Sequence, residues 1–171
     1  QVGNIIHEVL QRYVTNKALL DSKMLSKQKQ RWRRDLLACG FEDDAIEQAL
    51  VFIEASVLTT TSNTDLQWVF DNAHSQSSTE LAMQTLSAGR LNNHILDRSF
   101  IDKQGYRWII DYKSALKPAA LSQQQFKDRQ TDLHSAQLCR YRKLFAAESN
   151  AGIKTALLLT SIGELVEIAA D

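Results

Sequence analysis

The sequence predicts a mixed α/β domain with a helical first half and a β-sheet in its second half. Three observations carry this prediction. Apolar residues recur at helical spacing through the first half of the chain. From about residue 79 the pattern changes to short β-rich runs. A long polar helical segment then separates two groups of these runs, which is typical of a sheet covered by a helix.

Three helices are expected in the first half. The first covers residues 4–20, and the second covers 26–38 and stops at Gly40, a residue type suited to helix C-termini. The third covers 43–58, and a short helical piece follows at 65–71. Periodic apolar positions on one side of each segment indicate that these helices pack against one another.

The second half contains the predicted sheet and one long helix, roughly residues 122–148. The β-rich runs are 79–86, 93–102, 106–114, 154–160 and 165–169. We therefore expect one domain over 1–171, with a mainly helical part (1–75) and a part that carries the sheet and helix (76–171).

Net charge is zero, but its distribution along the chain is uneven. Residues 1–34 hold eight Lys or Arg against two acids, and 35–80 hold nine acids and no Lys or Arg. The basic run SKQKQRWRR (26–34) has two interpretations, a solvated helix face or a phosphate-contacting surface.

Other features limit the class of protein. Cys39 and Cys139 are too few for a disulfide framework or a four-cysteine metal site. We interpret them as small core residues and expect a reducing, cytoplasmic setting. No apolar run approaches the ~20 residues of a membrane span. The start QVGNIIHEVL, without Met, suggests a fragment of a longer chain.

The runs at 93–102 and 106–114 are expected to pair as a hairpin with a three-residue loop that ends in Gly105. Pairing symmetrically about the middle of this loop sets Asp97 opposite Asp111, and alternation puts Lys113 on the same face. A bulge at Gly105 would instead shift the register by one residue and separate the two acids.

Two carboxylates ~5 Å apart repel by roughly 3 kcal/mol at an effective dielectric near 20. Such a pair is tolerated where a cation neutralises it, and two acids on one face suit an open Mg²⁺ site. With an adjacent lysine, the chemistry indicated is phosphodiester hydrolysis. The alternative is an ordinary cross-strand Asp–Lys pair on a half-exposed sheet.

The wider motif set resembles the PD-(D/E)XK nuclease superfamily, and in particular the RecB/AddA-type nuclease domain of bacterial exonuclease V helicase–nucleases. The similar segments occur in the family's order. They are GNIIHEVLQ (3–11), ILDRSFID (95–102), GYRWIIDYKS (105–114) and AQLCRY (136–141). The resemblance implies a restriction-endonuclease-like central mixed β-sheet flanked by helices.

The resemblance also implies roles for individual residues. His7, Asp97, Asp111 and the backbone carbonyl of Tyr112 correspond to metal ligands. Lys113 corresponds to the catalytic lysine, and Gln137 and Tyr141 to a Q-x-x-x-Y motif at the active site. Mg²⁺ is the expected cofactor, with Mn²⁺ as a substitute. Two cysteines exclude the four-cysteine iron–sulfur cluster of related nucleases.

The expected function is an Mg²⁺-dependent exodeoxyribonuclease domain of a bacterial protein, coupled to an ATP-dependent helicase in double-strand-break repair and recombination. Its partners would be single-stranded DNA, helicase domains of the same chain and a second subunit, with no membrane. We expect DNA to contact Lys117, Arg140, Tyr141, Arg142 and Lys143. Two alternatives remain, a catalytically silent nuclease-like DNA-binding or interaction module and a free-standing exonuclease of the same fold.

Overall fold

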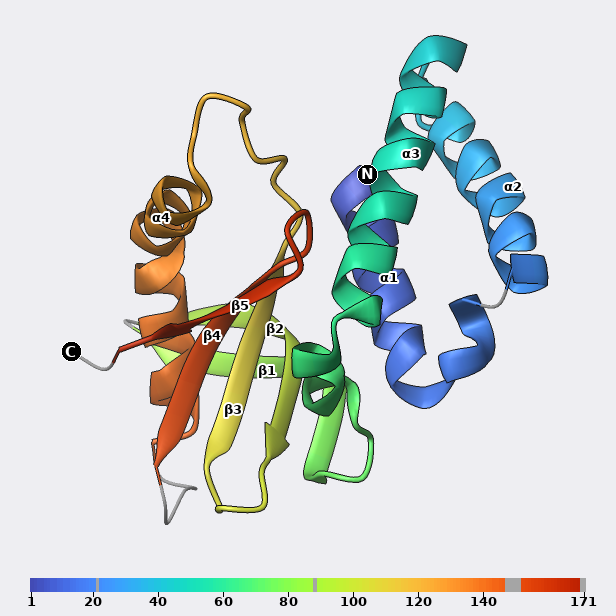
Figure 1. The fold of residues 1–171 in the computed structure, drawn as a ribbon. Coiled ribbons are helices and arrows are strands. Elements are labelled where there is room, and N and C mark those ends of the chain that lie inside the picture. The colour runs from blue at the N-terminus through green and yellow to red at the C-terminus, as the bar shows by residue number, and fades with distance from the viewer. Residues whose placement is uncertain (21, 88, 147–151, 170–171) are drawn as a thin grey trace. The chain divides into compact units, whose positions relative to one another are not determined.

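The computed structural model describes residues 1–20, 22–87, 89–146 and 152–169. The chain divides into two compact units (Figure 1). The first unit contains residues 1–71, 114–116 and 160–163, and the second contains 72–113, 117–159 and 164–171.

Helices form the first unit, as the sequence predicts. They are α1 (Val2–Thr15), η1 (Lys17–Leu20), α2 (Ser22–Ala38), α3 (Asp43–Ser62) and η2 (Thr64–Phe70), where η denotes a 3₁₀ helix. Six buried apolar side chains line one side of α1, namely Ile5, Ile6, Val9, Leu10, Tyr13 and Val14. Helix α2 contributes Trp32 and Leu36, which are 2% and 0% exposed. Burial of these apolar side chains stabilises helices that would be only marginally stable in isolation.

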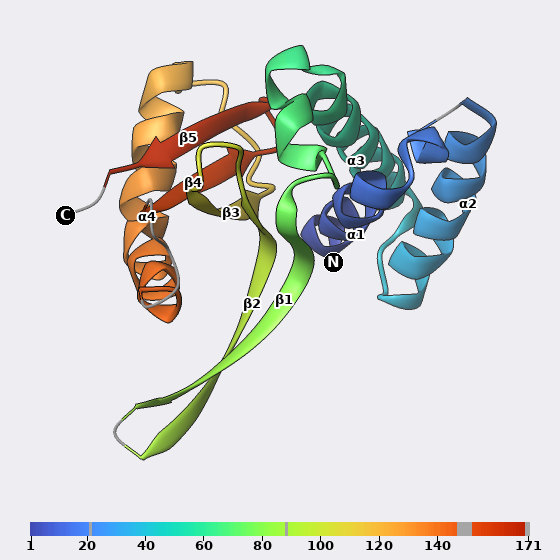
Figure 2. The ribbon, with the colours of Figure 1, turned by 90° about the horizontal axis from the view of Figure 1, so that it is seen from below.

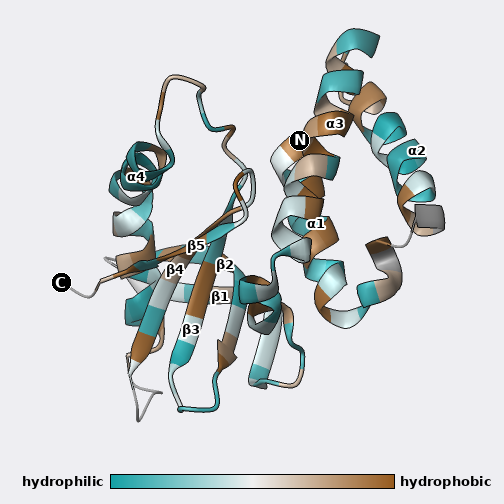
Figure 3. Cartoon of the chain, in the orientation of Figure 1, coloured by the Kyte–Doolittle hydropathy of each residue, from teal (hydrophilic) through white to brown (hydrophobic). Residues whose placement is uncertain are grey.

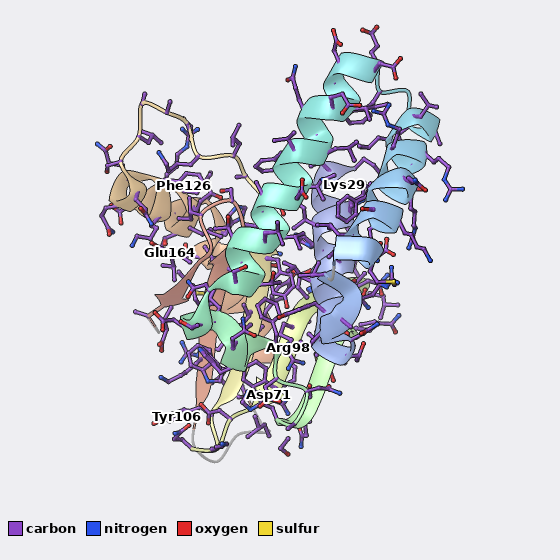
Figure 4. All side chains as sticks on the ribbon, turned by 45° about the vertical axis from the view of Figure 1, so that its right-hand side comes forward. Lys29, Asp71, Arg98, Tyr106, Phe126 and Glu164 are labelled. Atoms are coloured by element: carbon purple, nitrogen blue, oxygen red, sulfur yellow. The ribbon has the colours of Figure 1, made fainter. Side chains whose placement is uncertain are left out.

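Opposite charges of the first unit neutralise one another. Lys29 on α2, labelled in Figure 4, meets Glu54 at 2.6 Å. Arg31 meets Glu8 at 2.8 Å, and Arg33 pairs with Glu47. The basic run on α2 therefore has intramolecular acidic partners, which favours the interpretation as a solvated helix face over phosphate contact.

The second unit is built on a five-stranded mixed sheet in the order β1-β2-β3-β4-β5 (Figure 1). The strands are β1 (Ser75–Ser87), β2 (Arg90–Ile101), β3 (Arg107–Lys113), β4 (Ile153–Leu159) and β5 (Glu164–Ile168). Neighbours are antiparallel except β3 and β4, which are parallel. The described fold is thus mixed α/β and agrees with the expected restriction-endonuclease-like architecture.

The central strand β3 is buried on both sides. Six of its seven residues are buried, and its middle part is the most apolar stretch of the strand (Figure 3). Ile109 and Ile110 have successive side chains on opposite faces, and both are 0% exposed. Such burial is typical of a strand that pairs in parallel with its neighbour, because the helix in the connection between the two strands covers one face of the sheet.

Helix α4 (Gln123–Leu144) makes this crossover between β3 and β4. It begins with a capping box, in which the Ser122 side chain accepts from Gln125 N and the Gln125 side chain reaches back to Ser122 N. Lys127, beside Phe126 in the first turns, meets Glu164 of β5 at 2.9 Å (Figure 4). The long helix is therefore fixed to the sheet at its N-terminal end.

The helix expected over 4–20 is instead divided into α1 and η1. The expectation for the two cysteines is also wrong. Cys39, interpreted as a core residue, is exposed, and Cys139 is only half-buried. Cys39 follows the last residue of α2, where the chain turns at Gly40 with a φ of 82°. A helix end faces solvent more often than a helix middle, and periodicity alone does not reveal this.

Candidate active site

The hairpin of β2 and β3 determines where the two predicted acids lie. Its ladder pairs Arg98 with Ile110, Ser99 with Ile109 and Phe100 with Trp108. The ladder ends at the pair Arg98 and Ile110, and extending its register by one residue would set Asp97 opposite Asp111. Asp102 N donates to Tyr106 O at 3.0 Å, and Gly105 has a φ of 87°, so the three-residue loop forms as expected. The predicted register is confirmed over residues 98–101 and 107–110, and the one-residue slip is not found there.

Both acids are buried. Only 9% of Asp97 and 4% of Asp111 is exposed to solvent. Asp97 Oδ2 accepts a hydrogen bond from Tyr112 N at 2.6 Å, one residue past Asp111. The Asp97 carboxylate thus satisfies the backbone N–H of Tyr112, which lies beyond the last pair of the β2–β3 ladder. The acids are thus more buried than the alternative of an Asp–Lys pair on a half-exposed sheet requires, although Asp111 does pair with a partly exposed Lys113.

Lys113 and Gln137 complete a polar cluster around Asp111. Lys113 Nζ lies 2.7 Å from Asp111 Oδ2 and donates to Gln137 Oε1 at 3.1 Å. Gln137 Nε2 in turn donates to Asp111 Oδ1 at 3.2 Å. One amide therefore holds the acid and the lysine together through both of its polar atoms.

Tyr141 extends this cluster by one helical turn of α4. Gln137 Nε2 also donates to Tyr141 Oη at 2.7 Å, as four-residue spacing on one helix face allows. The Tyr141 hydroxyl donates to Ile95 O at 3.4 Å, so α4 contacts β2 two residues before Asp97. The Q-x-x-x-Y pair thus lies at the acid pair, although the two residues are remote from it in sequence.

Arg98 lies on the core face of β2, close to the Tyr112 phenol, and strand alternation alone does not explain a charged residue there. Burial raises the pKa of the Tyr112 phenol far above its usual range, Arg98 opposes that rise, and Asp97 and Glu80 add to it. Arg98 is 0% exposed and donates to Ser77 Oγ at 2.7 Å and to Ser78 O at 3.2 Å. A buried guanidinium on the core face is therefore held by β1.

His134 of α4 is a histidine near Lys113 that the sequence reasoning did not consider. Burial, and secondarily the positive charge of Lys113, lower the pKa of its imidazole. It precedes Gln137 by three residues on α4. The i, i+3 spacing to a predicted site residue is the signal that could have found it.

The predicted DNA-contacting residues fall into two groups. Lys117 Nζ donates to Leu121 O at 2.8 Å, and Arg142 Nη2 donates to Ile153 O at 2.7 Å. These two side chains therefore bind backbone carbonyls of the protein. Arg140 and Lys143 are instead exposed on α4 and line a pocket.

The donor set at the acid pair fits a hard divalent cation. Asp97 and Asp111 would supply two carboxylates, and the backbone carbonyl of Tyr112, between Asp111 and Lys113 in the sequence, stays a prediction as a further ligand. Within the described ranges, no group of three or more His, Cys, Asp or Glu forms a metal-binding arrangement. Mg²⁺ keeps several waters and needs few protein ligands, so two carboxylates suffice for an open site. His7 lies on α1 in the first unit, and its role as a further ligand stays a prediction.

Across the part of the chain that the structure describes, no helix is both long and apolar enough to traverse a bilayer.

Comparison with known proteins supports a nuclease assignment. No curated protein gives a significant match to the chain. The family model of the PD-(D/E)XK nuclease superfamily matches residues 1–165. Together with the sheet and the buried D-x-K segment at its centre, this match shows that the chain belongs to the PD-(D/E)XK nuclease superfamily.

Proposed function

We propose that this chain is a divalent-metal-dependent deoxyribonuclease domain of the RecB/AddA type. The observation that supports it most strongly is the buried pair Asp97 and Asp111 with Lys113 and Gln137 hydrogen-bonded beside it. Two like charges in one buried site are costly, so a protein retains them where chemistry needs them.

In this proposal, Asp97, Asp111 and the Tyr112 carbonyl would hold Mg²⁺ or Mn²⁺, and the motif on α1 adds His7. A divalent ion there supplies charge stabilisation at the scissile phosphate and lowers the pKa of water. Lys113 donates a hydrogen bond to the attacking water or to a phosphate oxygen. Gln137 accepts a hydrogen bond from the Lys113 ammonium and so holds it beside Asp111. Water adds to phosphorus and the P–O3′ bond breaks, which leaves 5′-phosphate and 3′-hydroxyl ends.

We further propose that the domain works at the end of a helicase-containing chain, 1–171 acting as one nuclease domain with 1–75 as its helical part. Support comes from the four motifs in family order and from the zero net charge, which is unusual for a domain that binds DNA alone. An attached helicase would deliver single-stranded DNA during break repair and recombination. The same chemistry suits a free-standing exonuclease.

Cleavage of labelled single- and double-stranded DNA with Mg²⁺ or Mn²⁺ tests the proposal. Wild type should cut, and Asp97→Asn and Asp111→Asn should not. Asp132→Asn, an exposed acid on α4, is the matched control and should cut normally. Uncut DNA with the wild type in both metals would favour the silent, DNA-binding alternative.

A second measurement tests the metal ligands without relying on activity. Isothermal titration of Mn²⁺ into the wild type should show binding that Asp111→Asn abolishes. His7→Ala should weaken that binding if the α1 motif supplies a ligand. Unchanged Mn²⁺ affinity in His7→Ala would remove the histidine from the proposed set.

A further inference from the structure

Strands β1 and β2 pair well beyond the acid pair, through Ala82–Ile95 to Ser87–Arg90. Figure 2 shows this ribbon, here called the arm, extending away from β3, β4 and β5. The second half of β2 is buried, whereas Arg90, Leu91, Asn92, Asn93 and Ile95 are exposed. A two-stranded ribbon is marginal by itself, so the arm gains little stability from its own contacts.

A pocket of about 420 Å³ lies between the arm and the C-terminal part of α4. This volume falls in the range of small-molecule sites. The arm lines it with Thr85, Asn92 and His94, and α4 lines it with Arg140, Lys143 and Leu144.

The lining favours a phosphorylated ligand. Arg140 and Lys143 bring two positive charges, and no carboxylate lines the pocket. Thr85 and Asn92 are direct cross-strand partners, and Thr85 Oγ1 lies 3.0 Å from His94 Nε2. A hydroxyl, an amide and an imidazole thus add hydrogen-bonding groups beside the cations. The pocket is larger than a phosphate needs, and Leu144 gives it an apolar wall for a sugar or base.

Direct contacts connect this pocket to the acid pair. The His94 ring meets the edge of the Tyr141 ring at 5.9 Å between centroids and 84° between planes. Tyr141 is hydrogen-bonded to Gln137, which is hydrogen-bonded to Asp111. From Gln137 to Leu144 the helix advances about 10 Å, so the pocket lies roughly two turns of α4 from the amide at the acid pair.

We propose that the pocket binds a nucleotide of the DNA strand next to the one that is cut, with its phosphate on Arg140 and Lys143. This inference rests on the proposed nuclease function and assigns the arm to substrate binding. Contacts between the pocket and this unreactive neighbouring nucleotide supply binding energy, and that energy holds the scissile phosphate at the acid pair.

Binding of a labelled short oligothymidylate, measured by fluorescence anisotropy with EDTA at low salt, tests the pocket separately from cleavage. Lys143→Gln removes one pocket cation, and Lys103→Gln removes one exposed cation from the β2–β3 loop as the matched control. Lys143→Gln should weaken binding several-fold and lower the slope of log affinity against log salt by about 0.7. The control should change neither quantity.

A charge-neutral variant separates the pocket from general electrostatic attraction. Asn92→Trp fills the pocket from an exposed strand position that tolerates aromatic residues. It should weaken binding about tenfold without altering the salt slope. Deoxythymidine monophosphate should compete with the oligonucleotide much better than inorganic phosphate does, because only the nucleotide fills the volume.

The results distinguish failure of the pocket from failure of the nuclease proposal. Equal affinities for Asn92→Trp, Lys143→Gln and Lys103→Gln, or no oligonucleotide binding by the wild type, would overturn the pocket assignment even if the chain cuts DNA. Equal competition by phosphate and the mononucleotide would overturn the nucleotide as ligand. Pocket-dependent binding without cleavage would retain the pocket as a nucleotide site for bound DNA, but would overturn the nuclease proposal and with it the place of the pocket beside a scissile phosphate.

Discussion

The two units of the chain place opposite charges together in different surroundings. In the first unit, Arg31 and Glu8 pair with 45% and 41% of their side chains exposed. In the second unit, Lys113 and Asp111 pair at 20% and 6% exposure, beside a second buried carboxylate. The first pairing balances charge on a surface, whereas the second lies inside the protein beside another buried carboxylate.

This difference separates stability from function. An exposed ion pair contributes about 0–1 kcal/mol, because water and salt screen it and the side chains lose freedom. A buried pair of like charges costs free energy, and proteins retain such clusters mainly at functional sites. We therefore expect substitutions in the second unit's cluster to affect cleavage strongly and stability weakly, and those in the first unit to affect neither by much.

The largest effect is expected for Asp111→Asn. Cleavage should fall by about 10³-fold or more, since loss of a metal-binding charge removes several kcal/mol of transition-state stabilisation. Thermal unfolding should show a Tm close to that of wild type, because the variant removes one of two like charges but also the ionic partner of Lys113. A Tm many degrees below wild type would contradict the comparison, since the acid would then serve the fold.

Lys113→Gln should lower cleavage by about 10²-fold, the scale of a positioned proton-transfer or hydrogen-bonding group. Glutamine keeps a hydrogen-bond donor and removes the charge. Single-turnover cleavage at saturating Mg²⁺ measures the effect. Lys103→Gln controls for the loss of one positive charge, and an equal loss in both variants would remove Lys113 from the chemistry.

Gln137→Ala should lower cleavage by about 10- to 100-fold, as expected for a residue that orients groups in direct contact with the metal. It should also raise the Mg²⁺ concentration needed for half-maximal activity, because Asp111 and Lys113 lose their shared amide. Gln124→Ala, on the same helix, removes an exposed hydrogen bond to Asp128 and is the control. An unchanged Mg²⁺ requirement would indicate that Gln137 only packs the helix.

In the first unit, Arg31→Ala should change the free energy of unfolding by less than about 1 kcal/mol. Urea denaturation measures this change, and cleavage should stay at the wild-type level. Repeating the denaturation at high salt should shrink the difference. A loss of several kcal/mol would show that the surface pairs stabilise the helices far more than their exposure implies.

The smallest effect concerns pH and His134. Its pKa is lowered in the folded protein, whereas the unfolded chain binds a proton near the usual value of 6.5. The folded state therefore loses stability as pH falls below about 6.5, and the penalty stops growing below the folded pKa. The Tm of His134→Gln should fall less than that of wild type between pH 7 and pH 5. Parallel Tm curves would show that this imidazole titrates normally.

Local rules were sufficient for the type and order of the elements and for the β2–β3 register, but not for element bounds such as the start of α2 at Ser22. Gly105 supplies the positive φ that a three-residue loop needs, and alternation then fixes which side chains face one another. The acid pair could therefore be located from about fifteen residues of sequence. Gln137 and Tyr141 could be placed there only through the family resemblance, because no local rule brings α4 to β3.

Features that depend on tertiary packing could not be predicted in this way. The sequence shows a basic run and an acidic run, but only the packed helices reveal that Lys29 finds Glu54. Exposure of Cys39 likewise depends on what covers the end of α2. The arm pocket combines residues near 90 and 140, and periodicity carries no information about their separation in space.

The crossover from β3 to β4 has a consequence for synthesis of the protein on the ribosome. Asp97, Asp111 and Lys113 emerge early, but β3 gains its parallel partner only when Ile153–Leu159 has been made. Gln137 also reaches the lysine only after α4 has folded back along the sheet. Contacts between sequence-distant segments form late in folding. A nascent chain that ends before residue 153 thus carries Asp97, Asp111 and Lys113 without the β4 and α4 contacts that organise them in the folded protein.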